Sequence, residues 1–312
     1  MAVNIPPKQG RRPWWQTDGG WVALLNAPSV LLILALVLYP VGYSFWMSLH
    51  RYNLRRPADT AFVGSENYQR ILQDPQFWDA LRVTLAFAGM SVAGVLLVGL
   101  GLALLLNAEF KGRAFLRALL LIPWAIPGVV NGLMWAGILG KNGGVNAVLG
   151  ALQPTWLGAL LPAKQTWLSD AAAALPAAAA AHVWKEVPFA TIVFLAALQA
   201  IPADQYRAAR VDGSTPWRTF RYVTLPWLLH PLLIVAIFQT MGAFRTFDLI
   251  YTLTGGGPGR ATHVIAWQTY KSAFSFLSFG HANAYAYLIA LITLGITVAY
   301  IRLLYRRGAV QA

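Results

Sequence analysis

Two charged residues, Lys185 and Glu186, lie within a long apolar stretch of the sequence, where charge is rare. If that stretch spans a membrane, each charge costs roughly 2.5–3.5 kcal/mol to insert at the helix centre, so keeping both calls for a functional reason. Adjacent side chains do not face each other on a helix. We therefore expect these two residues to have different partners, or to face a water-filled cavity.

Aromatic and helix-perturbing residues surround the same two charges. Pro188 removes the backbone hydrogen bond that would otherwise reach the carbonyl of Trp184, and such open backbone is tolerated at membrane depth only beside protein or water. His182 and Phe189 add a hydrogen-bonding ring and an apolar ring. A ligand site is one interpretation of this stretch. The simpler alternatives are that His182 is a satisfied core residue and that Trp184 anchors the helix at a membrane interface.

The composition indicates that a lipid bilayer is the main solvent of this chain. Of its 312 residues, 57% are hydrophobic and only 11% are charged, whereas soluble domains carry about 25% charged residues. The 24 Lys and Arg outnumber the 11 Asp and Glu, but they fall between the apolar runs, which fits membrane topology better than nucleic-acid binding. The chain has no cysteine, which excludes a disulfide scaffold, a thiolate metal site and a cysteine nucleophile.

Six stretches are candidates for crossing a bilayer, which takes roughly 20 apolar residues. The predicted spans are about 21–49, 83–108, 118–140, 178–200, 226–250 and 280–303. The first is longer than the core of a signal peptide, so we read it as an uncleaved helix. The sequence therefore predicts an all-α membrane protein with six transmembrane helices over 21–305, an N-terminal cytoplasmic segment 1–20 and a cytoplasmic tail 306–312.

The orientation of these spans rests on the positive residues of the short loops. Six spans place both termini on one side, and Lys and Arg favour the cytoplasm for that side by a narrow margin. Arg51, Arg55 and Arg56, which directly follow the first span, argue against it. We place both termini in the cytoplasm, because the sequence of the loop between the fourth and fifth spans indicates the side more strongly than the charge count does.

That loop, 201–226, reads IPADQYRAARVDGSTPWRTFRYVTLP and predicts two short helices joined by a tight turn. Pro202 suits a first helical turn, and Gly213 suits a left-handed C-terminal cap. Thr215 and Pro216 suit the N-cap and first residue of a second helix. An amphipathic hairpin lying on the membrane surface is the alternative to a functional loop.

The same loop resembles the coupling loop of permease subunits of binding-protein-dependent ABC importers. The residues that carry or border this pattern are Tyr206, Ala208, Ala209, Asp212, Gly213, Phe220, Leu225 and Pro226. Arg207 departs from it, since the family has Glu at that position. The motifs at 110–113, 121–127, 184–189 and 253–258 are similar to the carbohydrate-uptake branch, and specifically to its MalF-type subunit, so the resemblance covers nearly the whole chain.

This resemblance implies a MalF/MetI-like permease fold in a bacterial or archaeal cytoplasmic membrane. It also implies that the loop, including Arg207, docks on a cytoplasmic ATPase and passes its closure to the spans. The implied partners are a second, MalG-like permease subunit, a homodimeric MalK-like ABC ATPase, an extracytoplasmic sugar-binding protein and the lipid bilayer, with no nucleic acid.

Energy for transport has to come from another polypeptide. The sequence contains no Gly-x-x-x-x-Gly-Lys-Ser/Thr loop that could hold the phosphates of ATP, and no recognisable catalytic pair or metal-ligand spacing. We therefore expect no enzyme activity, no cofactor and no metal in this chain. ATP and Mg²⁺ are expected in the partner ATPase subunits.

A sugar offers hydroxyl groups and flat patches of C–H bonds, so its site should combine aromatic faces with a few hydrogen-bonding groups. The resemblance places such a site on three spans. The predicted substrate-binding residues are Trp124, Gly128, Asn131, His182, Trp184, Lys185, Glu186, Phe189, Gln239, Ala243 and Thr246. Ala243 replaces a hydrogen-bonding residue common in the family. As alternatives, Trp124 can be an interface anchor, and Gln239 and Thr246 can bridge helices.

The predicted function is the permease subunit of an ABC importer for a disaccharide or short oligosaccharide, maltose- or trehalose-like. One alternative keeps this architecture for a polyol or a glycerol phosphate, but a phosphate should bring several Lys or Arg into the site. An ion-coupled secondary transporter should show buried carboxylates in several spans, and only Glu186 and Asp248 qualify. For Arg245 and Asp248, an ion pair within one helix is the favoured interpretation.

Overall fold

The computed structural model describes residues 18–153 and 166–308. The predicted N-terminal segment up to residue 17 and the predicted tail from residue 309 lie outside these ranges. Within them the protein is built almost wholly of helices, and one small antiparallel pair of strands joins β1 (His50–Arg51) to β2 (Ala61–Phe62). This confirms the predicted all-α fold class.

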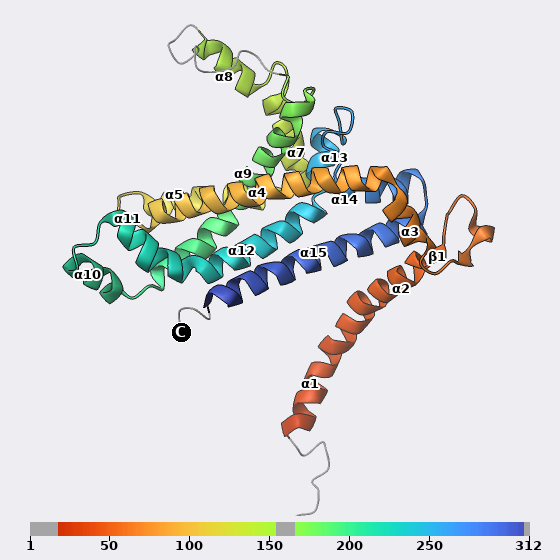
Figure 1. The fold of residues 1–312 in the computed structure, drawn as a ribbon, viewed down its shortest axis with the longest axis horizontal. Helices are drawn as coiled ribbons and strands as arrows, with labels where there is room; N and C mark the ends of the chain where they lie inside the picture. The colour runs from red at the N-terminus through yellow and green to blue at the C-terminus, as the bar shows by residue number, and fades with distance from the viewer. Residues whose placement is uncertain (1–17, 154–165, 309–312) are drawn as a thin grey trace, which may run out of the picture.

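The first predicted span is a continuous helix whose N-terminal half projects away from the rest of the molecule, whereas its C-terminal part packs on the helix 279–308, with the Tyr287 hydroxyl donating to the carbonyl of Val41 (Figure 1). It consists of α1 (Asp18–Ile33), a π-helical turn η2 (Leu34–Leu38) and α2 (Tyr39–Ser48). Its apolar side chains are exposed along most of its length. A helix this apolar and this exposed requires lipid or another protein around it.

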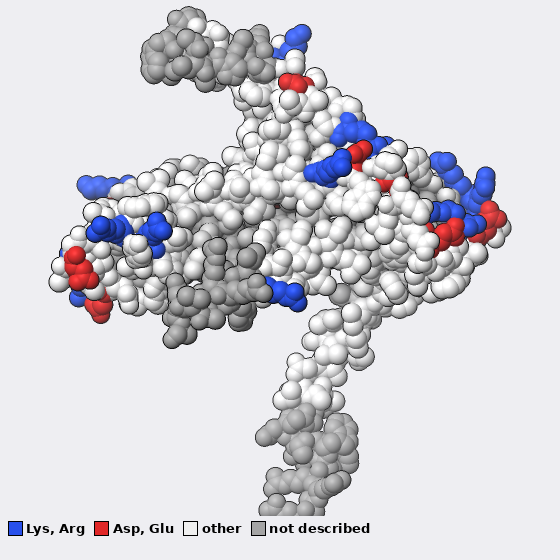
Figure 2. Space-filling model, in the orientation of Figure 1, with Lys and Arg blue, Asp and Glu red and all other residues white. Residues whose placement is uncertain are grey.

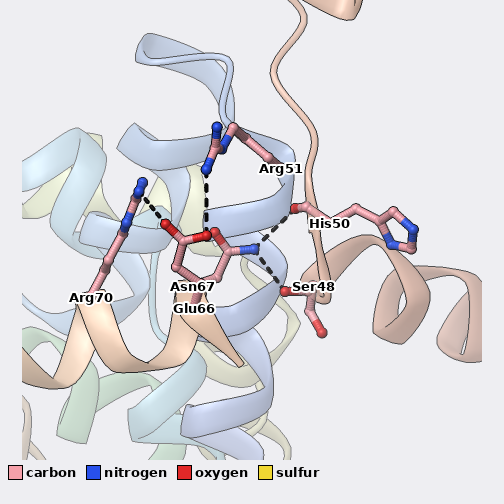
Figure 3. Close-up of polar contacts among 6 residues, drawn as sticks. All are labelled: Ser48, His50, Arg51, Glu66, Asn67 and Arg70. Carbon is pink, nitrogen blue, oxygen red and sulfur yellow. Dashed lines mark hydrogen bonds and ion pairs between the residues drawn. The ribbon is translucent and has the colours of Figure 1, made fainter. Parts of the chain in front are cut away.

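The end of this first helix is tied to α3 (Glu66–Gln73) by polar contacts (Figure 3). The Nδ2 of Asn67 donates to the carbonyls of Ser48, at 2.8 Å, and His50, at 3.0 Å. Asn67 is buried, and its side-chain amide satisfies the carbonyl of Ser48 at the end of the helix while adding a second bond to the carbonyl of His50. The 3₁₀ turn η3 (Pro57–Asp59) lies in the loop before β2.

The body of the protein is a bundle of four long helices that run side by side (Figure 1). They are α4 (Pro75–Asn107), α9 (Ala171–Gln199), α12 (Leu225–Arg245) and α15 (Phe279–Gly308). On the face drawn in Figure 2, charged side chains gather mainly at the two ends of this bundle, with a broad uncharged region between them. That distribution fits a bundle whose middle lies in hydrocarbon.

The third predicted span is wrong as a single helix. The stretch 118–140 is divided among α5 (Arg113–Leu120), α6 (Ile122–Ala125) and α7 (Gly128–Leu139). The chain bends by 100° between the helical segment Arg113–Ala125 and the helical segment Gly128–Leu152. The break falls at Ile126, whose backbone is extended (φ −74°, ψ 127°). It precedes Pro127, and a residue before proline is pushed out of the helical region by the proline ring. Depending on whether this bent pair counts, five or six segments of the described chain are long and apolar enough to cross a membrane.

The other spans also differ from their predicted bounds. The helix predicted over 83–108 starts at Pro75, and the one predicted over 226–250 ends at Arg245. Thr246 is extended (φ −65°, ψ 105°), so the chain breaks there and resumes as α13 (Asp248–Leu253). The helices α8 (Gly144–Leu152), α14 (Ile265–Tyr270) and the π-helical turn η5 (Lys271–Ser275) lie outside the bundle helices.

The loop 201–226 forms the predicted pair of helices at one end of the bundle (Figure 1). They are α10 (Ala203–Val211) and α11 (Pro216–Thr219), followed by the π-helical turn η4 (Phe220–Thr224). Gly213 has the left-handed conformation expected of a C-terminal cap (φ +68°), and the Thr215 hydroxyl accepts from the backbone N–H of Arg218. Pro202 is the N-cap of α10 instead of a residue of its first turn.

Close packing of α4 on α9 depends on small residues, as expected where lipid gives no hydrophobic drive for helix association. A Cβ at Gly99 would lie 2.8 Å from the Cβ of Ala190, whereas a Cβ at Gly101 would meet nothing within 4 Å.

We predict that Gly99→Leu lowers stability by about 1–3 kcal/mol through overpacking. Thermal unfolding of the detergent-purified protein, followed by circular dichroism, measures this. Gly101→Leu is the matched control and should leave the midpoint unchanged; equal midpoints for both variants would contradict the packing argument.

Candidate functional site

A cavity of about 500 Å³ opens among α7, α9, α12 and α13, near the two helix breaks. It brings together most of the predicted substrate-binding residues, namely Trp124, Gly128, Asn131, His182, Lys185, Glu186, Phe189, Gln239 and Thr246. The sequence analysis missed further lining residues: Phe238, Gly242, Phe247 and Leu249. Arg245 and Asp248, which it assigned to an ion pair, line the cavity too.

The helix break at Ile126 positions the aromatic wall of the cavity. Trp124 sits on the short helix α6 just before the break, and its ring stacks against Phe189 of α9 with centroids 6.4 Å apart. Phe189 in turn meets Phe238 of α12 edge-on, at 6.0 Å. Three separate helices therefore contribute to one aromatic surface, and Trp124 is half exposed above it.

Glycines on α7 let α13 approach closely enough to form the opposite wall. A Cβ at Gly128 would lie 2.9 Å from the Oδ2 of Asp248. One turn later, a Cβ at Gly132 would overlap the side chain of Thr252. The absence of both side chains brings the Asp248 carboxylate against the start of α7, where it lines the cavity.

Lys185 and Glu186 form an ion pair with each other. The Nζ of Lys185 lies 3.0 Å from the Oε1 of Glu186, and each side chain is about one-fifth exposed (20% and 21%). The expectation of separate partners is wrong, because both long side chains turn toward the cavity from neighbouring positions. Pairing with each other removes the cost of two isolated charges in a span.

Two buried polar atoms beside the cavity have no partner within the described residues. The Nδ2 of Asn131 donates to the carbonyl of Ala181 at 3.3 Å, but its Oδ1 accepts nothing. The Nε2 of His182 is also unsatisfied, while its ring packs edge-on against Phe87 at 5.3 Å. Buried polar atoms without a partner are costly, so these two atoms are candidates for hydrogen bonds to a bound molecule.

Two predicted site residues, Trp184 and Ala243, do not line the cavity. Trp184 lies off the helical face that carries His182, Lys185, Glu186 and Phe189, and packs edge-on against Trp135 at 5.9 Å. Ala243 is 1% exposed and belongs to the core between helices. On α9 the lining positions recur every three or four residues, and this period could have excluded Trp184. Ala243 keeps that spacing from Gln239 and Thr246, so no local signal excluded it.

The interpretation of Arg245 and Asp248 as an ion pair within one helix is also wrong. The break at Thr246 puts Arg245 at the end of α12 and Asp248 at the start of α13. The ion pairs of the described chain do not include these two residues. The lining of the cavity therefore holds two cationic and two anionic side chains, with no excess of either sign.

The residues predicted to couple to an ATPase divide between the two sides of the loop. Ala209 is buried, and the Tyr206 hydroxyl lies 3.2 Å from the hydroxyl of Thr224. Phe220 and Pro226 are half-buried. The exposed side is formed by Arg207, Ala208, Asp212 and Gly213. Arg207 forms an ion pair with Asp204, with 3.5 Å between Nε and Oδ1, and both side chains are largely exposed.

The described residues contain no group of three or more His, Cys, Asp and Glu side chains that could hold a metal ion. Outside the spans, burial chiefly lowers the pKa of His263, whose Nε2 lies 2.6 Å from the Oε1 of Gln268. It is remote in sequence from every cavity residue and supports the loop before α14.

Residues 95–308 match the family described as binding-protein-dependent transport system inner membrane component. The chain is 38% identical over 284 residues to the trehalose/maltose transport system permease protein MalF of Thermococcus litoralis, covering 89% of this chain and 92% of that relative. It is 37% identical over 266 residues to the trehalose transport system permease protein SugA of Mycobacterium tuberculosis, covering 85% and 82%. Among solved structures, a bacterial ABC transporter involved in import of the acidic polysaccharide alginate superimposes with a TM-score of 0.75 at 23% identity, covering 92% of this chain and 95% of that one.

The chain therefore belongs to the family of inner-membrane components of binding-protein-dependent transport systems. This confirms the family predicted from the coupling loop, the permease fold and the location in the cytoplasmic membrane.

The ion pair in α9 yields a prediction about stability. Lys185→Met leaves Glu186 as an unpaired charge in a span and should cost roughly 1–3 kcal/mol, less than for a fully buried pair because water reaches one-fifth of each side chain. The double variant Lys185→Met/Glu186→Gln should recover most of that loss. Midpoints of thermal unfolding in detergent report both. A double variant less stable than the single one would show that the two charges do not compensate each other.

Proposed function

We propose that this chain is the membrane-spanning permease subunit of an ABC importer for a disaccharide or short oligosaccharide, maltose- or trehalose-like. The observation that carries the proposal is the cavity itself. It places the unsatisfied Oδ1 of Asn131 and Nε2 of His182 beside the aromatic faces of Trp124 and Phe189. Hydroxyl groups of a sugar would hydrogen-bond to these two polar atoms, and its C–H faces would pack on the two aromatic rings.

The charge balance of the cavity favours a neutral cargo over a phosphate. Lys185 is paired with Glu186 at 3.0 Å, which leaves Arg245 as the single cation of the lining outside the ion pairs of the described residues, and Asp248 adds a negative charge to the same cavity. A phosphate would require several cationic donors that are not already neutralised. The relatives named for trehalose and maltose point to the same class of cargo.

Trp124 and Phe238 border the open side of the cavity, and each is about half exposed (49% and 59%). A second permease subunit packed against this rim would complete the enclosure that a small-molecule site needs. An extracytoplasmic sugar-binding protein would deliver the cargo at the end of the bundle opposite the loop 201–226. A solved relative in fold, described as a bacterial alginate transporter in complex with a pentasaccharide-bound periplasmic protein, supports that arrangement.

ATP and Mg²⁺ would be bound by a separate homodimeric ATPase, so this chain is a transporter subunit and not an enzyme. The exposed side of the loop 201–226, including Val211 and Trp217, which are 88% and 67% exposed, supplies an apolar surface for that docking. Sugar binding alone cannot drive uphill transport. The shift between inward- and outward-facing states has to come from the different affinity of nucleotide for the two states.

The proposal is tested with the complex purified with its co-expressed partners and reconstituted in lipid. ATPase activity is measured with the binding protein and a panel containing maltose, trehalose, a polyol and glycerol phosphate. We expect an α-glucoside to stimulate ATPase activity and glycerol phosphate to be without effect. Failure to co-purify an ATPase, or stimulation by glycerol phosphate alone, would overturn the proposal.

Within the same assay, Gln239→Leu should raise the sugar concentration for half-maximal stimulation about threefold to tenfold. Gln239 lines the cavity, and the substitution removes one hydrogen bond to a hydroxyl group. Trp184→Phe is the matched control, because Trp184 neighbours the site in sequence but faces Trp135. An equal effect of both substitutions would indicate general loss of structure and not loss of a ligand contact.

The coupling loop yields a separate prediction. Arg207→Glu reverses an exposed charge next to Asp204 and should change sugar-stimulated ATPase activity by about twofold to fivefold, without changing the affinity for sugar. Parallel measurements of ATPase rate and of sugar binding to the complex separate the two effects. If both transport and stimulated ATPase activity are untouched, Arg207 is not part of the contact with the ATPase.

A further inference from the structure

A continuous row of aromatic rings leads away from the cavity. It begins at Phe247, which lines the cavity, and consists of Phe247, Tyr251, Trp267, Tyr270 and Phe274. The sequence analysis assigned no role to these residues, and the cavity described above includes only the first of them. We call this set the aromatic row.

Neighbouring rings of the aromatic row are in contact. The centroids of Phe247 and Tyr270 are 4.3 Å apart and their planes are within 28° of parallel. Phe247 also stacks on Tyr251 at 5.4 Å and on Trp267 at 5.8 Å. Tyr270 continues outward to Phe274 at 4.9 Å. The row therefore runs without interruption from Phe247 at the cavity to Phe274.

The fold holds the aromatic row in place from three separate segments. Tyr251 lies on α13, Trp267 and Tyr270 lie on α14, and Phe274 lies on η5, all far from the loop 201–226 (Figure 1). Gly256 has a left-handed conformation (φ +86°), and any Cβ there would collide with the indole of Trp267. This glycine permits the close approach that brings α14 beside α13.

The outer side of the aromatic row is open. Tyr251 is 49% exposed and Phe274 is 61% exposed. The hydroxyl groups of Tyr251 and Tyr270 make no hydrogen bond within the part of the chain that the structure describes. Exposed aromatic faces edged by free hydroxyl groups have the same chemistry as the cavity wall, and this chemistry suits sugar rings.

A membrane-interface belt would be built differently. Belt residues are placed separately around the bundle, each with its ring at the headgroup level. The rings of the aromatic row instead lie against one another and join the cavity through Phe247. This continuity with the cavity is the argument for sugar as the occupant.

We propose that the aromatic row is a second sugar subsite, which binds the units of an oligosaccharide that extend beyond the cavity toward the extracytoplasmic end. The proposal rests on the proposed function and deepens it: the cavity would hold one end of the cargo, and Tyr251 would hold the next units. Consequently the row should matter for a longer sugar and not for a disaccharide that the cavity alone accommodates.

The test compares two named probes, maltose and maltotetraose, on the permease–ATPase complex in lipid nanodiscs without binding protein. Saturation-transfer NMR titrations measure the dissociation constant of each. Tyr251→Ala should weaken maltotetraose binding about threefold to tenfold and change maltose binding less than twofold. Tyr251→Phe keeps the ring and should restore most of the affinity.

Phe62→Ala is the matched control, because Phe62 is 70% exposed at the same end of the molecule but lies outside the aromatic row. It should affect neither sugar. Equal weakening of both sugars by Tyr251→Ala, or no change for maltotetraose, would overturn the second subsite while leaving the cavity as the sugar site. If the unsubstituted complex binds neither probe, the proposed function fails, and the subsite fails with it.

Discussion

The structure depends on the requirement that every backbone polar group inside a bilayer be satisfied by the chain itself. Long helices meet this requirement, and α4, α9 and α15 run without a break. The two interruptions, at Ile126 before Pro127 and at Thr246 after Arg245, both lie beside the cavity. Irregular backbone within a membrane is tolerated only next to protein or water. The position of the two helix breaks beside the cavity meets this condition.

Two helices, α9 and α12, connect the cavity with the loop 201–226. The helix α9 carries His182 to Phe189 at the cavity and ends directly before the loop, whereas α12 begins directly after the loop and ends at the cavity with Arg245. The contact of Tyr206 with Thr224 ties α10 to the base of α12. Under the proposed function, a displacement of the loop would pass along these two helices to the cavity.

Fold and cargo are separate questions in this family. The alginate importer shares the fold with a TM-score of 0.75 at only 23% identity, so the backbone architecture survives large changes of sequence. Under the proposed function, selectivity resides in the side chains that reach the cavity. Here they are aromatic faces, a balanced set of charges and two unsatisfied polar atoms, and the aromatic row extends this chemistry outward.

The sequence alone determined what depends on local chemistry. Apolar length predicted the helices, and the signals at Gly213 and Thr215 predicted the turn and cap of the loop, because these preferences act within a few residues. Its resemblance to a known family also indicated most of the cavity residues. Only the tertiary structure decided the partner of Lys185, the packing of Trp184 on Trp135 and the separation of Arg245 from Asp248. Those outcomes depend on where helices break and how closely their neighbours approach, and no local pattern encodes the distance between two helices.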